Sequence, residues 1–311
     1  MTCLLCESES VRTCDSLSKK QLIELWRDLG FDVAAKAFDC ISNATTVDLQ
    51  KCDSCGFQFF NPSLVGDSRF YDELFSQSPA GYYSPMRPEF EWALPIARRE
   101  GAQRVLDVGC GNGFFLEYFR KAGFETFGLE YSPSAASAAR EKGFVIVEKK
   151  LGDCMPEDFG GTFDLICLFQ VLEHVPNPVQ FIRDAARLVK PGGSLIIAVP
   201  TEEGLPSKLA PYEPHRWPPH HLSWWRKKDF ATLAGRAGLQ LNAVGYSILN
   251  AETISYFGKV GIRESKILKP NALTFPPRLF WFIAGCFKRL GGEKLKLRGG
   301  HGMFAHLSKR S

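Results

Sequence analysis

Residues 105–113 read Val105-Leu106-Asp107-Val108-Gly109-Cys110-Gly111-Asn112-Gly113. Apolar residues around an acid predict a buried strand, and the alternating glycines predict a loop at its carboxyl end. Because glycine adopts positive φ readily and has no Cβ, a ligand can lie directly against this backbone. The dinucleotide-binding fingerprint places its last glycine three residues after the second, whereas these glycines alternate. The spacing therefore favours a nucleoside-like ligand other than NAD.

The residues after the glycine loop alternate between helical and extended patterns. They predict helices over 114–122, 132–142, 177–189 and 227–237, and strands over 125–130, 144–147, 163–169 and 194–199. The run 163–169 is almost continuously apolar, which is typical of a parallel strand covered on both faces. A turn at Lys190–Gly193 separates the third helix from the next strand. This alternation predicts an α/β fold with a doubly wound sheet.

An acid closes the strand that follows the glycine loop. Glu130 lies 21 residues after Gly109 in the sequence. In dinucleotide-binding folds an acid at this position binds two ribose hydroxyls, which need an acceptor with two oxygens. Glu130 is therefore a candidate ribose ligand, and the alternative is a solvated acid at a strand end.

Several motifs together resemble class I S-adenosylmethionine-dependent methyltransferases that act on small molecules and sugars. They are the Asp-x-Gly-x-Gly-x-Gly loop, the segment 170–175 after the apolar strand, and the Pro-Gly-Gly turn at 191–193. The resemblance implies a Rossmann-like doubly wound seven-stranded sheet whose last strand, at 301–307, is antiparallel. The tetrapeptide Asn/Asp-Pro-Pro-Tyr, typical of amino-methylating enzymes that act on nucleobases, is absent, which disfavours a nucleic-acid substrate.

The resemblance also implies S-adenosyl-L-methionine as the cofactor and indicates which residues contact it. Asp153 falls where the family contacts the adenine amino group, although it also suits the cap of a turn. His174 is interpreted as a helix-end histidine bonded to backbone rather than as a catalytic group. The cofactor-binding candidates are Asp107, Gly109, Gly111, Gly113, Glu130, Asp153, Cys154 and Gln170.

Two Cys-x-x-Cys pairs near the amino end predict a small zinc-binding module. Cys3, Cys6, Cys52 and Cys55 would provide four thiolates, and such a closed set indicates a structural Zn²⁺ ion. Cys14 and Cys40 lie between the pairs as rival ligands, and a disulfide framework is the main alternative. The absence of an apolar leader favours a reducing compartment and hence metal. Residues 17–31 have the spacing of one amphipathic helix.

Several methyltransferases from glycan and natural-product gene clusters resemble this chain over most of residues 1–245. Tyr82 and Tyr83 belong to that resemblance and either close over the cofactor or simply pack. The resulting organisation is a zinc-binding module over 1–62, a connecting segment over 63–88 that closes over the cofactor, and a methyltransferase domain over 89–311. The methyltransferase domain contains a helical insert at about 250–298.

The segment 214–225 places two histidines among prolines and tryptophans, where the acceptor would bind. Methyl transfer is an in-line displacement, and the enzyme must remove one proton from the acceptor. Imidazole suits that task near neutral pH. Related sugar methyltransferases carry a His-His or Glu-His pair here, so His220 and His221 are the candidate bases. Trp224 and Trp225 would stack on a sugar or ring, or else fill the core while the histidines cap the next helix.

Composition fits a cytoplasmic enzyme with a substantial core, since 45% of the 311 residues are hydrophobic and 23% are charged. Residues 259–311 hold 12 Lys and Arg against two acids, about +10, whereas the whole chain carries +4. Residues 275–298 are basic and partly apolar, so they predict either peripheral membrane contact or an insert that covers the acceptor site.

The sequence thus predicts transfer of a methyl group to a hydroxyl or carbon of a saccharide or small natural-product intermediate. Two alternatives remain open. An RNA methyltransferase would use the zinc module to grip nucleic acid and should carry basic residues around the cysteines, but residues 1–60 mix acids and bases. A non-catalytic protein would bind S-adenosylmethionine only as a ligand.

Overall fold

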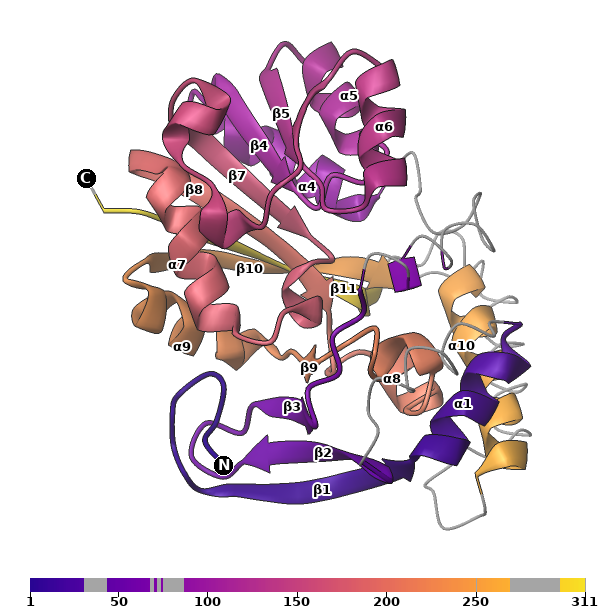
Figure 1. The fold of residues 1–311 in the computed structure, drawn as a ribbon. Coiled ribbons are helices and arrows are strands. Elements are labelled where there is room, and N and C mark those ends of the chain that lie inside the picture. The colour runs from indigo at the N-terminus through magenta and orange to yellow at the C-terminus, as the bar shows by residue number, and fades with distance from the viewer. Residues whose placement is uncertain are drawn as a thin grey trace.

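The computed structural model describes residues 1–30, 44–67, 70–71, 74, 87–249, 251–268 and 297–310. Within these ranges a seven-stranded sheet organises most of the chain (Figure 1). In spatial order its strands are β10 (Gln240–Leu249), β11 (Leu297–Ser308), β8 (Val189–Pro200), β7 (Phe163–Phe169), β4 (Arg104–Val108), β5 (Glu125–Leu129) and β6 (Val145–Val147). Neighbours from β8 to β6 are parallel, and β11 is antiparallel to both of its neighbours. The predicted fold class is confirmed.

Both faces of this sheet are covered by helices, which explains the unbroken apolar run of β7. Alternate β7 residues belong to different clusters: Ile166 and Leu168 pack with α7 (Pro178–Leu188) and α9 (Lys227–Ala237). Leu165 and Cys167 face the other cluster. That second cluster is built from α4 (Pro88–Arg99), α5 (Phe114–Lys121) and α6 (Pro133–Glu141).

Strand order reverses between β4 and β7. From β4 the chain proceeds to β5 and β6 on one side, and from β7 it proceeds to β8 on the other. The loops leaving β4 and β7 therefore diverge at the carboxyl edge of the sheet, and the crevice between such loops is where doubly wound folds bind ligands. The glycine loop and Gln170 both start at this edge.

A second, four-stranded antiparallel sheet forms the amino-terminal part of the described chain (Figure 1). Its order is β1 (Val11–Ser18), β2 (Thr46–Cys52), β3 (Gln58–Asn61) and β9 (Ser223–Trp224). The helix expected over 17–31 is confirmed as α1 (Lys19–Asp28), which Ser18 and Gln21 start with a capping box. Because β9 lies beyond residue 89 and the other three strands lie before residue 62, the boundaries expected at 62 and 89 divide this sheet between two segments.

Some predicted element bounds differ from the structure. The turn expected at Lys190–Gly193 lies inside β8, which pairs with β7 through a register shift. The helical insert begins as α10 (Ala251–Ile267), and residues 269–296, with most of the proposed membrane segment 275–298, lie outside the described residues. None of the described helices has the length and apolar character needed to span a bilayer.

Helix α10 packs closely against α8 (Leu205–Leu209), which leads from β8 toward the histidine segment. A Cβ at Gly261 would lie 2.0 Å from the Leu209 carbonyl oxygen. We expect Gly261→Ala to push the helices apart and to lower the free energy of unfolding by about 1–3 kcal/mol in a denaturant titration.

The matched control is Gly235→Ala in α9, where an added Cβ would meet no atom within 4 Å. Alanine is the better helix former, so this variant should be unchanged or about 0.5–1 kcal/mol more stable. Equal stability of the two variants would show that the close helix packing does not constrain residue 261.

Candidate active site

The glycine loop turns sharply as β4 ends. Gly109, Gly111 and Gly113 have φ of +74°, +53° and +82°, values that side chains with a Cβ rarely adopt. At Gly109 there is also no room, because a Cβ would lie 2.6 Å from Cγ2 of Val171. The β4 loop and the β7 loop thus touch through a residue that must be glycine.

Glu130 fixes the shape of this loop from the neighbouring strand. One carboxylate oxygen accepts the backbone N–H of Gly111 at 2.8 Å, and the other accepts that of Ser132 at 2.8 Å. Ser132 in turn caps α6, because its hydroxyl accepts the N–H of Ala135. Each carboxylate oxygen has further lone-pair capacity, so Glu130 fits two ribose hydroxyls while bracing the loop.

Asp107 lies beneath the loop, and one of its carboxylate oxygens has no hydrogen-bond donor among the described residues. Its side chain is 3% exposed, and Oδ1 has no hydrogen-bond partner among the described residues. Burial, and then the nearby Glu130 carboxylate, raise the pKa of Asp107 well above its usual range. A positively charged ligand beside it would satisfy Oδ1. This orphaned oxygen fits the ammonium and sulfonium charges of S-adenosylmethionine.

One cavity of about 590 Å³ joins the loop to the histidine segment. Six predicted site residues line it: Asp107, Gly109, Glu130, Gln170, His220 and His221. Four others do not line it: Gly111, Gly113, Asp153 and Cys154. Tyr82 and Tyr83 lie outside the described residues.

Gln170 reaches the cavity through an unusual backbone conformation. Its φ is +57°, and its N–H donates to the Ala198 carbonyl on β8 at 2.8 Å. A left-handed residue that is not glycine carries strain, and such strain concentrates at binding sites. Gln170 thus ends β7 and starts the loop that leads to Glu173 and His174.

The opposite part of the cavity wall is a histidine cluster, defined here as His174, His220 and His221. His174 ends a short 3-10 turn, η3 (Leu172–His174), and its Nδ1 contacts the His220 carbonyl and the Tyr71 hydroxyl. His220 Nδ1 lies 2.8 Å from the His215 carbonyl oxygen. The η3 turn and the segment before β9 thereby hold the three rings together.

Burial keeps these side chains uncharged. Desolvation lowers the pKa of His174 to about 4, and desolvation with neighbouring imidazoles lowers the pKa values of His220 and His221 well below the usual range. Desolvation raises the pKa of the adjacent Glu173 to about 8. Neutral imidazoles can accept a proton or bind a cation.

The two tryptophans pack rather than line the cavity. Trp225 is fully buried, stacks on Phe230 of α9 and donates its Nε1–H to the Ser223 hydroxyl. Trp224 donates its Nε1–H to the Arg216 carbonyl, and the Arg216 guanidinium lies over its ring. The expectation that they stack on an acceptor is wrong, and the alternative that they fill core is confirmed. Arg226 and Asp229 cap α9, so the histidines do not.

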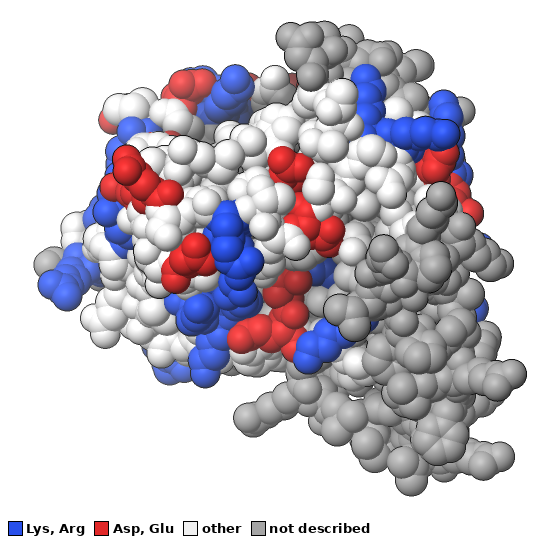
Figure 2. Space-filling model, turned by 90° about the horizontal axis from the view of Figure 1, so that it is seen from below, with Lys and Arg blue, Asp and Glu red and all other residues white. Residues whose placement is uncertain are grey.

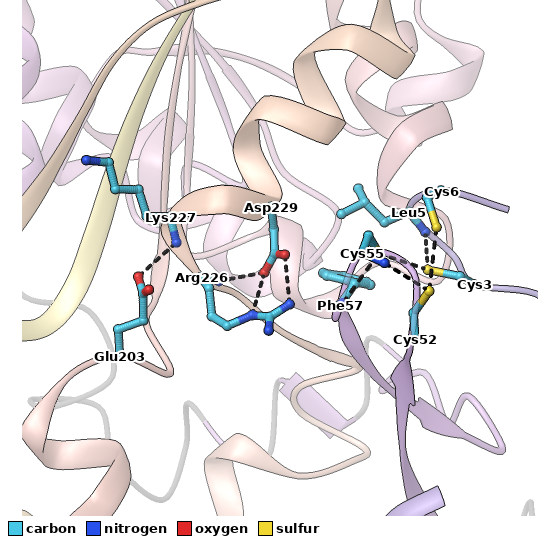
Figure 3. A network of polar contacts seen from close by, with 10 residues as sticks. All are labelled: Cys3, Leu5, Cys6, Cys52, Cys55, Phe57, Glu203, Arg226, Lys227 and Asp229. Carbon is cyan, nitrogen blue, oxygen red and sulfur yellow. Dashed lines mark hydrogen bonds and ion pairs between the residues drawn. The ribbon is translucent and has the colours of Figure 1, made fainter. Parts of the chain in front are cut away.

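The four predicted zinc ligands converge at the start of the chain (Figure 3). The Sγ atoms of Cys3 and Cys55 are 3.6 Å apart, as are those of Cys6 and Cys52. A disulfide requires about 2.05 Å, whereas four thiolates around zinc lie about 3.8 Å from one another. The thiol of Cys14 instead donates to the Leu49 carbonyl.

Backbone amides also point at these sulfurs. The N–H groups of Leu5, Cys55 and Phe57 donate to Sγ of Cys3, Cys52 and Cys55 respectively (Figure 3). Such donors stabilise negative sulfur, as a metal-bound thiolate requires. The cluster fits a tetrahedral ion, and the competing disulfide does not fit these distances.

Sequence reasoning missed several residues of the cavity wall. Arg87, Asn112, Tyr131 and Glu173 line the cavity, as does His174, for which only its backbone bond was expected. Asn112 lies inside the glycine motif, and Tyr131 directly follows Glu130. Their positions next to predicted cofactor ligands could therefore have identified them as cavity residues. Glu173 gave no such signal, because its importance depends on the distant histidines.

Comparisons with known proteins agree with this geometry. A family model described as "Methyltransferase domain" matches residues 82–244. A ubiquinone biosynthesis O-methyltransferase of Xanthomonas axonopodis pv. citri (strain 306) is 31% identical over 191 residues, which cover 57% of this chain and 78% of that protein. A protein of the same name from Alkalilimnicola ehrlichii is 29% identical over 212 residues, covering 61% and 85%.

A solved structure from Thermotoga maritima, described as a SAM-dependent methyltransferase and possible histamine N-methyltransferase, has the same fold. Its TM-score is 0.51 at 16% identity, and the match covers 78% of this chain and 98% of the other. The family model covers just over half of this chain, and it includes the glycine loop, Glu130 and both histidines. The chain therefore belongs to the methyltransferase-domain family, and it is an S-adenosylmethionine-dependent methyltransferase.

Proposed function

We propose that this enzyme transfers the methyl group of S-adenosylmethionine to a hydroxyl, or to a carbon, of a saccharide or small natural-product intermediate. The observation that carries the proposal is the single cavity lined both by Gly109 and Glu130 and by the histidine cluster. An acceptor against the imidazoles would face the cofactor's methyl group. The names of the relatives, which describe O-methyltransferases, support a hydroxyl as the acceptor.

Cofactor binding would rest on the acids and the glycine loop. Glu130 would accept the ribose hydroxyls, and Asp107 would lie near the positive charge of the methionyl part. Gly109, Gly111 and Gly113 would give the backbone the shape that lets the cofactor approach, and Gln170 would border it from β7. Asp153 and Cys154 would contact the adenine outside the described cavity.

His220 or His221 would take the acceptor's proton. In the displacement the acceptor oxygen forms a bond to the methyl carbon as the bond from sulfur breaks, and the hydroxyl proton passes to an imidazole. S-adenosylhomocysteine leaves as a neutral thioether. Both histidines line the cavity and are buried, and desolvation lowers the pKa of each ring, so each ring is uncharged before the transfer.

Surface charge supports a small acceptor over RNA. In the view of Figure 2 acidic and basic side chains lie beside one another across the described surface, and no broad area carries one sign. Around the cysteines, Arg12 pairs with Asp53, and Arg236 pairs with Glu7. Nucleic-acid binding depends on unpaired basic groups along a phosphate backbone. A cytoplasmic location and a peripheral membrane contact through 275–298 stay predictions.

We also propose that Cys3, Cys6, Cys52 and Cys55 bind a structural Zn²⁺ ion. The sulfur spacing and the three N–H donors support this choice. With four thiolates the ion would have no open coordination position, so it would stabilise the fold and take no part in methyl transfer. Cys3 and Cys52 pack in the same hydrophobic cluster as Trp225, so the ion would stabilise packing next to β9.

Removal of the Glu130 carboxylate should weaken cofactor binding. We expect Glu130→Ala to lower the affinity for S-adenosylhomocysteine about 10- to 100-fold in calorimetry, because it loses charge-assisted hydrogen bonds. The control is Glu125→Ala at the other end of β5, where a partly exposed pair with Arg104 contributes little. Wild-type affinity in Glu130→Ala would remove this residue from the cofactor site.

Loss of either histidine should lower turnover more than cofactor affinity. With labelled S-adenosylmethionine and fractionated cell extract, wild-type protein should label a small-molecule or glycan fraction. His220→Ala or His221→Ala should reduce that transfer about 10²- to 10⁴-fold, the usual contribution of a positioned acid or base. S-adenosylhomocysteine affinity should change little.

The control is His306→Gln on β11, a buried histidine that contacts Ser194 and Glu100 and does not line the cavity. It should retain most of the activity. Full turnover in both His220→Ala and His221→Ala would contradict the proposed base. Label recovered in RNA would contradict the proposed acceptor class.

Disruption of the cysteine cluster should release one zinc ion per chain. We expect Cys52→Ser to lose that ion and to unfold more easily, because the free energy of metal binding contributes to folding. Cys14→Ser should keep the ion, since Cys14 is exposed and bonded to Leu49. Elemental analysis with thermal unfolding measures both. Equal zinc content in the two variants would refute the site.

A further inference from the structure

The histidine cluster has the arrangement of a metal site, separate from the four cysteines. One potential ligand atom from each of His174, His220 and His221 lies within 4.8 Å of those of the other two. Ring centroids are 4.5 Å apart for His174 and His220, 5.0 Å for His174 and His221, and 4.7 Å for His220 and His221. The rings come from two loops that converge on one cavity.

Backbone carbonyls indicate the tautomers of two of the rings. Nδ1 of His174 contacts the His220 carbonyl, and Nδ1 of His220 contacts the His215 carbonyl at 2.8 Å. A carbonyl can only accept, so each Nδ1 carries a hydrogen, and in the neutral ring the lone pair is on Nε2. Metal-binding histidines show this same pattern, in which the second nitrogen donates to a carbonyl or carboxylate and orients the ring.

A buried carboxylate completes the arrangement. Glu173 is 1% exposed, and neither of its carboxylate oxygens has a hydrogen-bond partner among the described residues. Its Oε1 lies 3.7 Å from Nε2 of His174 and 4.0 Å from Nε2 of His221. A buried acid without donors is costly, and a cation between these atoms would satisfy it.

We propose that His174, His220 and His221 bind a divalent transition-metal ion, with Glu173 as a fourth ligand or as the neighbouring counter-charge. Imidazole nitrogen binds zinc, iron, cobalt and nickel, at about 2.0–2.1 Å for zinc. Ligand atoms around such an ion lie about 3.3–3.5 Å apart, so nitrogens that now lie within 4.8 Å of one another would close by up to about 1.5 Å on binding. Unlike the cysteine site, this one opens on a cavity.

The ion would give the cavity a position for an oxygen of the acceptor. Three protein nitrogens leave coordination positions open, and a hydroxyl bound there would be held beside the cofactor and made more acidic. This last step rests on the proposed methyl transfer, whereas ion binding itself does not. An imidazole whose lone pair binds an ion is not a base, so in the ion-bound enzyme the hydroxyl proton would pass to the carboxylate of Glu173 beside the cluster.

Binding of Co²⁺ tests the site without an acceptor. The full-length protein, with zinc retained at the cysteines, is treated with a mild chelator and titrated with Co²⁺. We expect one Co²⁺ per chain with visible ligand-field absorption and without the near-ultraviolet band of cobalt thiolates. His174→Ala and Glu173→Gln should each weaken binding at least about tenfold, the loss typical of altered metal surroundings.

His306→Gln is the matched control, because it changes a buried histidine that does not line the cavity, and it should bind Co²⁺ as the wild type does. Binding of S-adenosylhomocysteine, measured by calorimetry, reports whether each variant is folded. If His174→Ala does not bind it, the Co²⁺ affinity of Glu173→Gln decides whether the metal site exists. No visible absorption in wild type, or equal Co²⁺ affinity in wild type and Glu173→Gln, overturns the proposal. Either of these results leaves intact the proposal that His220 or His221 is the base. Failure of the wild-type protein to bind S-adenosylhomocysteine would overturn the proposed methyl transfer but not the proposed metal site.

Discussion

The contact between the loops that leave β4 and β7 is the constraint on which the site depends. These strands are neighbours, but the chain leaves them toward opposite edges of the sheet. Gly109 and Val171 close the gap at the point of divergence, with no space for a side chain at residue 109. Three residues that line the cavity are positioned from this junction: Glu130 from the next strand outward, and Glu173 and His174 from the loop after β7.

Local signals in the sequence located five of the seven strands of the main sheet, whereas β11 was expected from the family resemblance and β10 was not expected. The strand over Phe163–Phe169 and the helix over Lys227–Ala237 were expected at their observed bounds, since a continuous apolar run and a periodic one each identify their element. The β8 strand was expected to start after Gly193 because Pro and Gly normally mark turns, yet it begins at Val189. Only Val189 pairs with β7 before Ser194, so residues 190–193 bulge out between two paired positions, as Pro and Gly there favour.

The candidate site was only partly predictable, because part of it is made by distant segments. The glycine motif identified Asp107, Gly109 and Glu130, which are contiguous with recognisable elements. His174 was expected only to bond to backbone, which it does, but the backbone carbonyl belongs to His220. No sequence pattern predicts that His174 contacts His220, because the contact depends on where β9 joins the amino-terminal sheet.

β9 joins the two parts of the molecule. Ser223 and Trp224, which follow His221 after one intervening residue, pair with β3, so the amino-terminal sheet holds the segment that presents the imidazoles to the cavity. A shortened enzyme that kept only the cofactor-binding half would leave this segment without a partner strand and would expose Trp224. The cysteine-containing part consequently supports the segment that carries His220 and His221, and a variant without that part would lose the strand that pairs with β9.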